Sequence, residues 1–311
     1  MLLAHISDPH VIDWHGLPLK CFRGKRFSGW LNFKLNRGRR LRRDVLERIL
    51  EDIRAQSPDH VTVTGDVSSL GFRQEMQTFG RLLDTHGFRG DDLSLVPGNH
   101  DAYTPDAWRG DRLLSELGRF CTSDLHGGMP GFPFVRLRGP LALVGLDSAV
   151  ARPGFTANGQ LGHAQIRRLV DVLRCSEVRS RFPVVLVHHP PLAYPRWLKE
   201  VQAGLFDRAS FLRAMESGLE GRPALVLSGH WHFRHRSVLD LPGPVEVLTI
   251  SSASFRGGGE RRQAAYHLIR FRETPPGIRG VEVRGYDPAR GQVVTLAKWS
   301  GRLSAVSAPA R

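Results

Sequence analysis

Short apolar runs rich in β-branched side chains recur along the chain and predict buried strands. The first set of these runs covers residues 2–6, 60–64, 93–96, 184–187 and 224–227. Elsewhere apolar positions repeat at helical intervals, which predicts helices over residues 41–55, 73–86, 107–120 and 160–174. Strands that alternate with helices are typical of an α/β fold with parallel strands.

The remaining predicted strands follow a different pattern, in which turns rather than helices separate them. Residues 134–137 and 141–146 predict a hairpin around Arg138-Gly139-Pro140. The late strands cover residues 238–241, 245–250, 265–271, 281–286 and 292–297, with Pro, Gly and Asp in the turns between them. Early βαβ units and late antiparallel strands together predict two sheets packed face to face, with helices outside.

Length and composition are those of a globular domain. The 311 residues are 41% hydrophobic and 24% charged, which allows a substantial core. We expect one domain over residues 1–299 and a tail over 300–311. No run reaches the roughly 18 apolar residues of a transmembrane helix. Polar residues follow Met1 within ten positions, so we expect no secretory signal either.

The cysteines bear on the cellular compartment. Cys21, Cys121 and Cys175 are odd in number and lack CxxC spacing, which disfavours both a disulfide framework and a zinc-thiolate site. A reducing cytoplasm is therefore the expected location.

Polar residues of the types that hold metals follow each strand of the first set. They are Asp8 and His10, Asp66, Asn99 with His100 and Asp101, His188 with His189, and His230 with His232. The carboxyl ends of strands in open α/β sheets are where ligands bind. Oxygen and imidazole donors without thiolate suit Mn, Fe or Zn in particular. Seven of these residues are candidate ligands: Asp8, His10, Asp66, Asn99, His188, His230 and His232. Seven ligands exceed the four of one tetrahedral zinc, so we predict two ions sharing a carboxylate.

Each of these residues also has an ordinary structural explanation. Asp8 and Asp66 could be capping or turn carboxylates, Asn99 a turn residue and His188 a buried core histidine. The combination decides between the two interpretations, because independent accidents would not place all five clusters in order at strand ends.

The ordered pattern D-x-H, G-D, G-N-H-D, H and G-H-x-H over residues 1–255 resembles the calcineurin-like metallophosphoesterase superfamily. The resemblance implies a four-layer α-β-β-α sandwich of two mixed β-sheets flanked by helices. It assigns one metal to Asp8, His10, Asp66 and His232, and the other to Asp66, Asn99, His188 and His230. His188 is selected over His189 by its position before Pro190, which leaves His189 to face the substrate or to support a ligand.

The resemblance also implies a mechanism. A metal-bridging hydroxide attacks phosphorus, since coordination lowers the pKa of water to about 7. His100 stands near the leaving-group oxygen and donates a proton or a hydrogen bond, while Asp101 orients its imidazole. Asp147, at the end of the strand over residues 141–146, could contact the substrate or serve as a turn carboxylate.

The segment between the first two clusters, residues 14–43, is the basic-aromatic insertion. It contains no acidic residue, and bulky apolar side chains alternate with its cations. The cations are Lys20, Arg23, Lys25, Arg26, Lys34, Arg37, Arg39, Arg40, Arg42 and Arg43. Three interpretations stay open: contact with an anionic membrane through residues 20–43, a lid that binds substrate through Arg23, Lys25 and Arg26, or a solvated rim.

The sequence is compatible with several classes of substrate. A phosphodiesterase of the cyclic-nucleotide type is the first hypothesis for this phosphohydrolase. The alternative is a membrane-associated hydrolase of UDP-2,3-diacylglucosamine in lipid A synthesis, although that group has Arg in place of His100. A nucleic-acid-binding protein or nuclease is suggested by the net charge of +14, which the codon usage of a GC-rich genome, favouring Arg, would also explain. A non-enzymatic scaffold is the weakest hypothesis.

Overall fold

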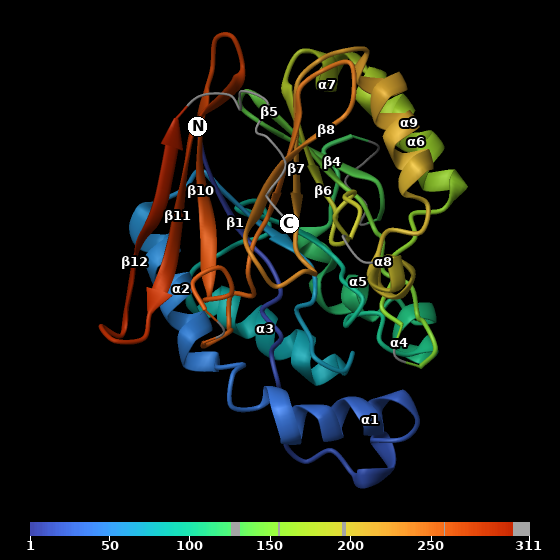
Figure 1. Cartoon of the computed structure of the whole chain (residues 1–311), viewed down its shortest axis with the longest axis vertical. Coiled ribbons are helices and arrows are strands. Elements are labelled where there is room, and N and C mark those ends of the chain that lie inside the picture. Colours follow the sequence, from blue (N-terminus) through green and yellow to red (C-terminus); the bar gives the residue numbers. More distant parts are fainter. Residues whose placement is uncertain (126–130, 155, 195–196, 258, 301–311) are drawn as a thin grey trace.

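The computed structural model describes residues 1–125, 131–154, 156–194, 197–257 and 259–300, and this part of the chain forms two six-stranded sheets packed face to face (Figure 1). The first sheet has the order β12 (Gln292–Ser300), β11 (Gly277–Asp287), β10 (Ala265–Arg272), β1 (Leu2–Ile6), β2 (His60–Thr64), β3 (Leu93–Val96). The second has the order β4 (Phe134–Arg138), β5 (Leu141–Gly145), β6 (Phe182–Leu186), β7 (Ala224–Ser228), β9 (Val245–Thr249), β8 (His235–Leu239).

Both sheets are mixed. In the first sheet β1, β2 and β3 are parallel, and β10 to β12 continue antiparallel from β1. In the second sheet β5, β6, β7 and β9 are parallel, whereas β4 and β8 lie antiparallel at its edges. The predicted two-sheet architecture is confirmed.

Helices cover the outer faces and complete the four layers. Figure 1 shows α2 (Arg43–Gln56) and α3 (Arg73–Thr85) outside the first sheet, with α6 (His163–Arg174) and α9 (Arg208–Leu219) outside the second. The shorter helical elements are α1 (Lys25–Asn32), α4 (Pro105–Arg109), α5 (Arg112–Leu117), α7 (Ser176–Arg179), α8 (Trp197–Ala203), η1 (Leu19–Cys21), η2 (Phe33–Arg37) and η3 (Gly118–Phe120). No helix in the described part of the chain is long and apolar enough to cross a membrane.

Strand alternation divides the core. On β6, Val184 and Leu186 face the apolar cluster between the sheets, whereas Val185 and the following Val187 pack with α6 and α9. All four side chains are fully buried. Burial of such a side chain contributes about 1.5–3 kcal/mol, so both faces of the strand fix its position.

Several elements differ from the sequence prediction. The helix predicted over residues 107–120 is broken at Gly110 and Asp111 into α4, α5 and η3, and Asp111 has a left-handed backbone (φ 40°). The helix α9 was not predicted, although Phe211, Met215 and Leu219 repeat at helical spacing on its buried face. Ser300, expected in the tail, ends β12, and residues 301–311 lie outside the described part.

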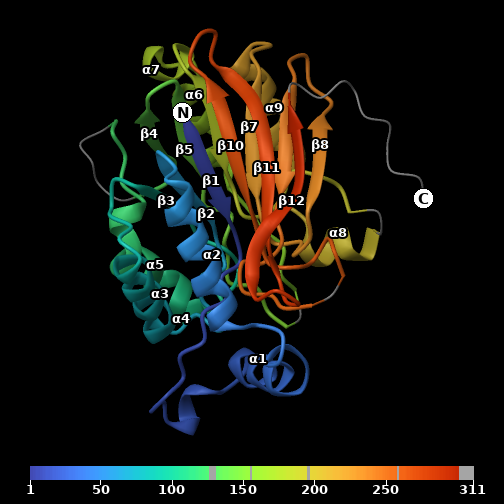
Figure 2. The same cartoon turned by 90° about the vertical axis from the view of Figure 1, so that its left-hand side faces the viewer.

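The basic-aromatic insertion contains η1, α1 and η2, none of which was predicted. Figures 1 and 2 both place α1 beyond the ends of the two sheets. The inner face of the insertion packs on the domain, where Phe22 and Trp30 join an apolar cluster with Leu70 and Tyr103. The insertion is therefore anchored to the loops that carry the candidate site.

Candidate metal centre

The candidate ligands lie on five loops, each leaving the carboxyl end of a strand: β1, β2 and β3 in the first sheet, β6 and β7 in the second. The loops bond directly to one another. The amide of Asp8 donates to the carbonyl of Gly65 (3.0 Å), and the amide of His230 donates to Asp8 Oδ2 (3.1 Å). The two sheets thus bring together residues that are far apart in sequence.

The backbone of these loops is strained at the candidate ligands. Positive φ angles occur at Asp8 (52°), His10 (45°), Asp66 (52°), His230 (66°) and His232 (54°). Such a conformation costs a non-glycine residue of order 1–3 kcal/mol and persists only where surrounding contacts enforce it. Among the other described non-glycine residues only Ser57, Asp111 and Glu220 adopt it. Strain is therefore concentrated at this site.

Close approach of the loops requires two glycines. A Cβ on Gly98 would overlap the amide and Oδ1 of Asp66, and one on Gly229 would overlap Ser7 Oγ and Asp8 Oδ2. Neither position has room for a side chain, so glycine is needed at both for space.

The first group of candidate ligands consists of Asp8, His10, Asp66 and His232, whose potential donor atoms lie within 4.8 Å of one another. His232 Nε2 lies 3.1 Å from both Asp8 Oδ1 and His10 Nε2. Asp66 Oδ2 lies 3.8 Å from His10 Nε2. Asp8 Oδ1 is buried and accepts no hydrogen bond from the residues that the structure describes, which is the environment that a cation would satisfy. These four are the residues that the resemblance assigns to one metal.

The second group surrounds His188. Its Nε2 lies 3.3 Å from Asp66 Oδ2 and 3.2 Å from Asn99 Oδ1, and its ring packs against His230 with 5.1 Å between centroids. Asp66 Oδ1 accepts a hydrogen bond from the His100 amide (2.7 Å). Asp66 Oδ2 thus faces both groups and is placed to be shared by two ions.

Backbone carbonyls orient three of the candidate histidines. The bonded pairs are His10 Nδ1 with Ser68 O (3.3 Å), His188 Nδ1 with Thr64 O (2.6 Å) and His230 Nε2 with Ala203 O (2.9 Å). In a neutral imidazole the nitrogen that donates to the carbonyl carries the proton, so the other nitrogen of that ring is the one available to a metal ion. Burial lowers the pKa of His188, but Asp66 and Asp8 raise it to about 9, so a metal ion bound there would displace a proton.

The electrostatics also fit divalent cations. Burial would raise the pKa of Asp8, but His232 and His188 hold it below its ordinary value. Burial would likewise raise the pKa of Asp66, and His188 and His100 hold it well below that value. Two ionised carboxylates in a buried site need a positive partner. The oxygen and imidazole donors suit transition metals.

His100 borders the first group. Its Nδ1 lies 2.6 Å from Ser69 O, and its ring meets the His10 ring edge-on with 4.8 Å between centroids. Burial lowers the pKa of His100 to about 4, although Asp66 acts in the opposite direction. The imidazole is therefore neutral at pH 7 before substrate binds, with Nε2 free.

Asp101 does not orient this imidazole in the way that we expected, because His100 Nδ1 bonds to the carbonyl oxygen of Ser69 and not to the Asp101 carboxylate. Asp101 instead accepts hydrogen bonds from the amides of Gly98 (2.9 Å), Ser68 (2.9 Å) and Val67 (3.3 Å), and from Ser68 Oγ (2.9 Å). An ionised carboxylate suits this position because it can accept several hydrogen bonds. Asp101 thus joins the loops that follow β2 and β3.

His189 and Asp147 are engaged away from a substrate. His189 is buried, with Nδ1 2.7 Å from Ser148 Oγ and Nε2 3.0 Å from Ala157 O, and its ring packs against His230. Its ring contact with His230 fits the supporting role, and one of its nitrogens also lies with those of His188 and His230 in a group that could hold a metal ion. Asp147 Oδ1 accepts a hydrogen bond from the Ala149 amide (2.7 Å), as a turn carboxylate does.

The three insertion residues proposed to bind substrate have separate environments. Arg26 is bound to Asp106 (3.2 Å) and to the carbonyl of Leu70 (3.1 Å), so it anchors α1 rather than facing a substrate. Lys25 Nζ donates to a carbonyl of the loop after β5, that of Arg152 (2.9 Å). Arg23 is exposed.

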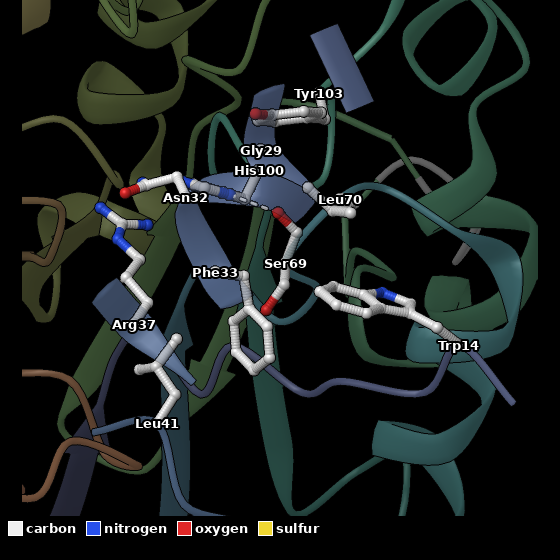
Figure 3. A pocket seen from close by; sticks show the side chains of 10 residues that line it. All are labelled: Trp14, Gly29, Asn32, Phe33, Arg37, Leu41, Ser69, Leu70, His100 and Tyr103. Carbon is white, nitrogen blue, oxygen red and sulfur yellow. Dashed lines mark hydrogen bonds between the residues drawn. The ribbon is translucent and has the colours of Figure 1, made fainter. Parts of the chain in front are cut away.

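A pocket with a cavity volume of about 30 Å³ lies between the insertion and the ligand loops (Figure 3). His100 and Ser69 line one side, and the insertion supplies most of the remainder. The insertion residues are Trp14, Gly29, Asn32, Phe33, Arg37 and Leu41. Sequence reasoning singled out neither the pocket nor Arg37, which was one of ten cations in the insertion.

Comparison with known proteins establishes the family. The model of the calcineurin-like phosphoesterase family matches residues 1–234. This match covers most of the chain, so the chain belongs to that family and is a metal-dependent phosphoester hydrolase. The dependence of the family on a dinuclear metal centre accords with the Asp and His groups described above. Among curated proteins, none matches the chain.

Solved structures support the fold. A dimetal phosphatase from Danio rerio has a TM-score of 0.60 and 17% identity, with 95% of this chain and 98% of that chain covered. A purple acid phosphatase from yellow lupin (Lupinus luteus) seeds has a TM-score of 0.56 and 10% identity, with 95% of this chain and 52% of that chain covered. At these identities the likeness is one of fold.

Proposed function

We propose that the chain hydrolyses a phosphodiester at a centre of two divalent metal ions. One ion would be held by Asp8, His10, Asp66 and His232, and the other by Asp66, Asn99, His188 and His230. The observation that carries the proposal is the position of Asp66 Oδ2, which faces a histidine of each group. When bound, such ions supply Lewis-acid stabilisation and a nucleophilic water at neutral pH.

His100 is the proposed proton donor to the leaving-group oxygen. Its Nδ1 proton is directed to Ser69 O, so Nε2 must gain a proton before it can donate one. The negative charge of a bound phosphoester would favour the imidazolium by raising the pKa of His100. Asp101 is a positioning residue in this mechanism, because it acts through the loops that hold His100.

An assay panel with Mn²⁺ tests the proposed activity. The substrates are bis-p-nitrophenyl phosphate, cyclic AMP, UDP-2,3-diacylglucosamine and single-stranded DNA. We expect metal-dependent hydrolysis of a diester, and we expect Asp66→Asn to lower kcat/KM by more than about 100-fold, since loss of even an outer-shell partner costs 10–100-fold. Asp147→Asn is the control and should retain activity.

Two results would contradict this proposal. The enzyme would lack the proposed activity if no ester were hydrolysed with any of Mn²⁺, Fe²⁺ or Zn²⁺. Full activity of Asp66→Asn would remove the bridging role. Preferential cleavage of single-stranded DNA would favour the nuclease alternative suggested by the net charge.

A second candidate function is hydrolysis of a membrane lipid pyrophosphate of the UDP-2,3-diacylglucosamine type, at the inner face of the membrane. The outer side of the insertion favours it: Phe27, Leu31 and Leu35 recur at four-residue spacing and are 52%, 41% and 71% exposed. No hydrogen bond or ion pair joins the side chains of Lys20, Arg23, Arg39 or Arg40 to another described residue. Such cations each contribute about 1 kcal/mol near an anionic leaflet.

Sedimentation with vesicles of phosphatidylglycerol and phosphatidylcholine tests this membrane contact. We expect the wild-type protein to bind at moderate salt and the triple variant Phe27→Ser, Leu31→Ser, Leu35→Ser to remain in solution. Val238→Ser, which removes an exposed apolar side chain from β8, is the control and should bind normally. Equal sedimentation of the wild-type protein and the triple variant would exclude the insertion as the contact surface.

A further inference from the structure

The pocket beside His100 has a mixed chemical character. Trp14, Phe33 and Tyr103 give it aromatic walls, while Arg37 and Asn32 add polar groups from the insertion (Figure 3). Trp14 and Phe33 meet edge to face with 4.8 Å between ring centroids, which fixes both walls. The pocket is therefore a built feature, formed where the insertion closes over the ligand loops.

Arg37 is the distinctive residue of this pocket. It is half-buried, yet no hydrogen bond, ion pair or aromatic face within the described part of the chain engages its guanidinium. Arg26, in the same segment, shows how a structural arginine is accommodated, with Asp106 and the carbonyl of Leu70 as partners. A partly desolvated guanidinium without a partner is costly unless something else pairs with it.

The second polar group is already oriented. Asn36 Nδ2 donates to Asn32 Oδ1 at 2.9 Å, so the amide oxygen of Asn32 is engaged and its NH₂ group remains free to donate. Figure 3 shows Asn32 and the guanidinium of Arg37 close together at the same side of the pocket. Two donors that no carboxylate of the described residues pairs with are suited to an anion with several oxygens, such as phosphate.

The position of the pocket determines which part of a substrate would reach these donors. His100 lies between the pocket and the first ligand group, since it lines the pocket and its ring contacts that of His10. A phosphorus atom at the ligand groups would therefore have its leaving group on the pocket side of His100.

We infer that Arg37, assisted by Asn32, forms an anion subsite for the leaving group, so that the preferred substrate is a phosphoric anhydride or a diester whose leaving group carries a second phosphate. This inference rests on the proposed function. In the reaction, the oxygen of water bonds to phosphorus and the bond from phosphorus to the leaving-group oxygen breaks. A proton of the water is released, the leaving group keeps the electron pair of the broken bond, and its oxygen receives a proton from His100. Arg37 would pair with the second phosphate of that leaving group.

A binding experiment tests the subsite independently of turnover. The protein loaded with Mn²⁺ is titrated calorimetrically with methylenediphosphonate and with methylphosphonate, which differ by the second phosphonate. We expect the wild-type protein to bind the diphosphonate more tightly, and Arg37→Gln to reduce that preference about ten-fold or more. Affinity for methylphosphonate should not change, and Arg37→Lys should restore part of the preference.

Arg40→Gln is the matched control, because it removes an exposed cation three residues away and should leave the preference unchanged. The subsite is excluded if Arg37→Gln and the wild-type protein have the same preference for the diphosphonate, or if Arg40→Gln reduces that preference as much as Arg37→Gln does. It is also excluded if Arg37→Gln weakens the binding of both ligands equally. Loss of the preference in a protein that hydrolyses no ester would support the subsite and contradict the proposed function. Normal turnover with an unchanged preference would contradict the subsite alone.

Discussion

The imidazole of His100 has one ring nitrogen bonded to Ser69 O at 2.6 Å and the other free beside the first ligand group. This arrangement makes a prediction about leaving groups. A proton donor matters most when the leaving group is a poor one, because p-nitrophenolate departs without protonation and an alkoxide does not. General acid catalysis of this kind contributes about 10²–10⁴-fold.

We therefore expect His100→Gln to lower kcat at least 100-fold for an alkyl phosphodiester and much less for bis-p-nitrophenyl phosphate. Steady-state kinetics on the two substrates measure the difference. His86→Gln, at the end of α3 and away from the ligand loops, is the control and should affect neither substrate. An equal loss on both substrates would assign His100 to metal or substrate binding instead.

At the scale of elements, the first turn of α3 connects the candidate site with the insertion. The carboxylate of Glu75 is fully buried and accepts hydrogen bonds from the amides of Leu70 (3.0 Å) and Phe72 (2.9 Å) and from the indole of Trp14 (2.8 Å). It also accepts one from the amide of Ser69 (3.2 Å), the residue that holds His100. One side chain thus positions both a pocket wall and the proposed proton donor.

Glu75→Ala should leave these donors unsatisfied, which costs about 1–3 kcal/mol for each buried group. We expect the free energy of unfolding in urea to fall by at least about 2 kcal/mol and trypsin to cleave within residues 14–43 faster. The control Glu51→Ala removes an exposed carboxylate from α2 and should change neither measurement. Cleavage at the wild-type rate in Glu75→Ala would show that the insertion is held by its apolar contacts alone.

At the scale of the whole molecule, buried histidines away from the ligand loops make stability depend on pH. His60 on β2 and His267 on β10 are almost fully buried, and burial lowers the pKa of each to about 3. Arg138 and Arg136 contribute to the shift of His60. Below pH 6.5 the unfolded chain therefore binds protons that the folded chain does not.

The free energy of unfolding should consequently decrease as pH falls from about 6.5 toward 3, by up to about 1.4 kcal/mol per pH unit for each histidine. Urea unfolding at pH 7 and pH 5, with a chelator present, measures the slope, and His60→Gln should reduce it. Ser94→Ala removes the hydrogen-bond partner of His60 but keeps the imidazole, so its slope should match the wild type. A slope in His60→Gln equal to that of the wild type would contradict the prediction.

Local sequence patterns were enough to locate several strands and to give the order of the polar clusters. Residues 2–6, 60–64 and 93–96 are strands with the predicted bounds, because continuous apolar runs at those lengths have few alternatives. Because Asp8, Asp66 and His188 directly follow such runs, we expected them at the carboxyl edges of the sheets. Their order also suggested the family, which the match to the family model confirmed.

The way in which these residues act together depends on contacts that form only in the folded chain. In the folded chain Asp101 has partners on two loops, Arg37 has none among the described residues, and the insertion forms one wall of a pocket. The left-handed backbone at Asp8 and Asp66 and the shared position of Asp66 Oδ2 likewise depend on contacts between distant segments. A local stretch of sequence carries secondary-structure propensity and hydrophobic periodicity. The strained backbone and the shared carboxylate instead depend on packing between distant segments, which overrides local conformational preference.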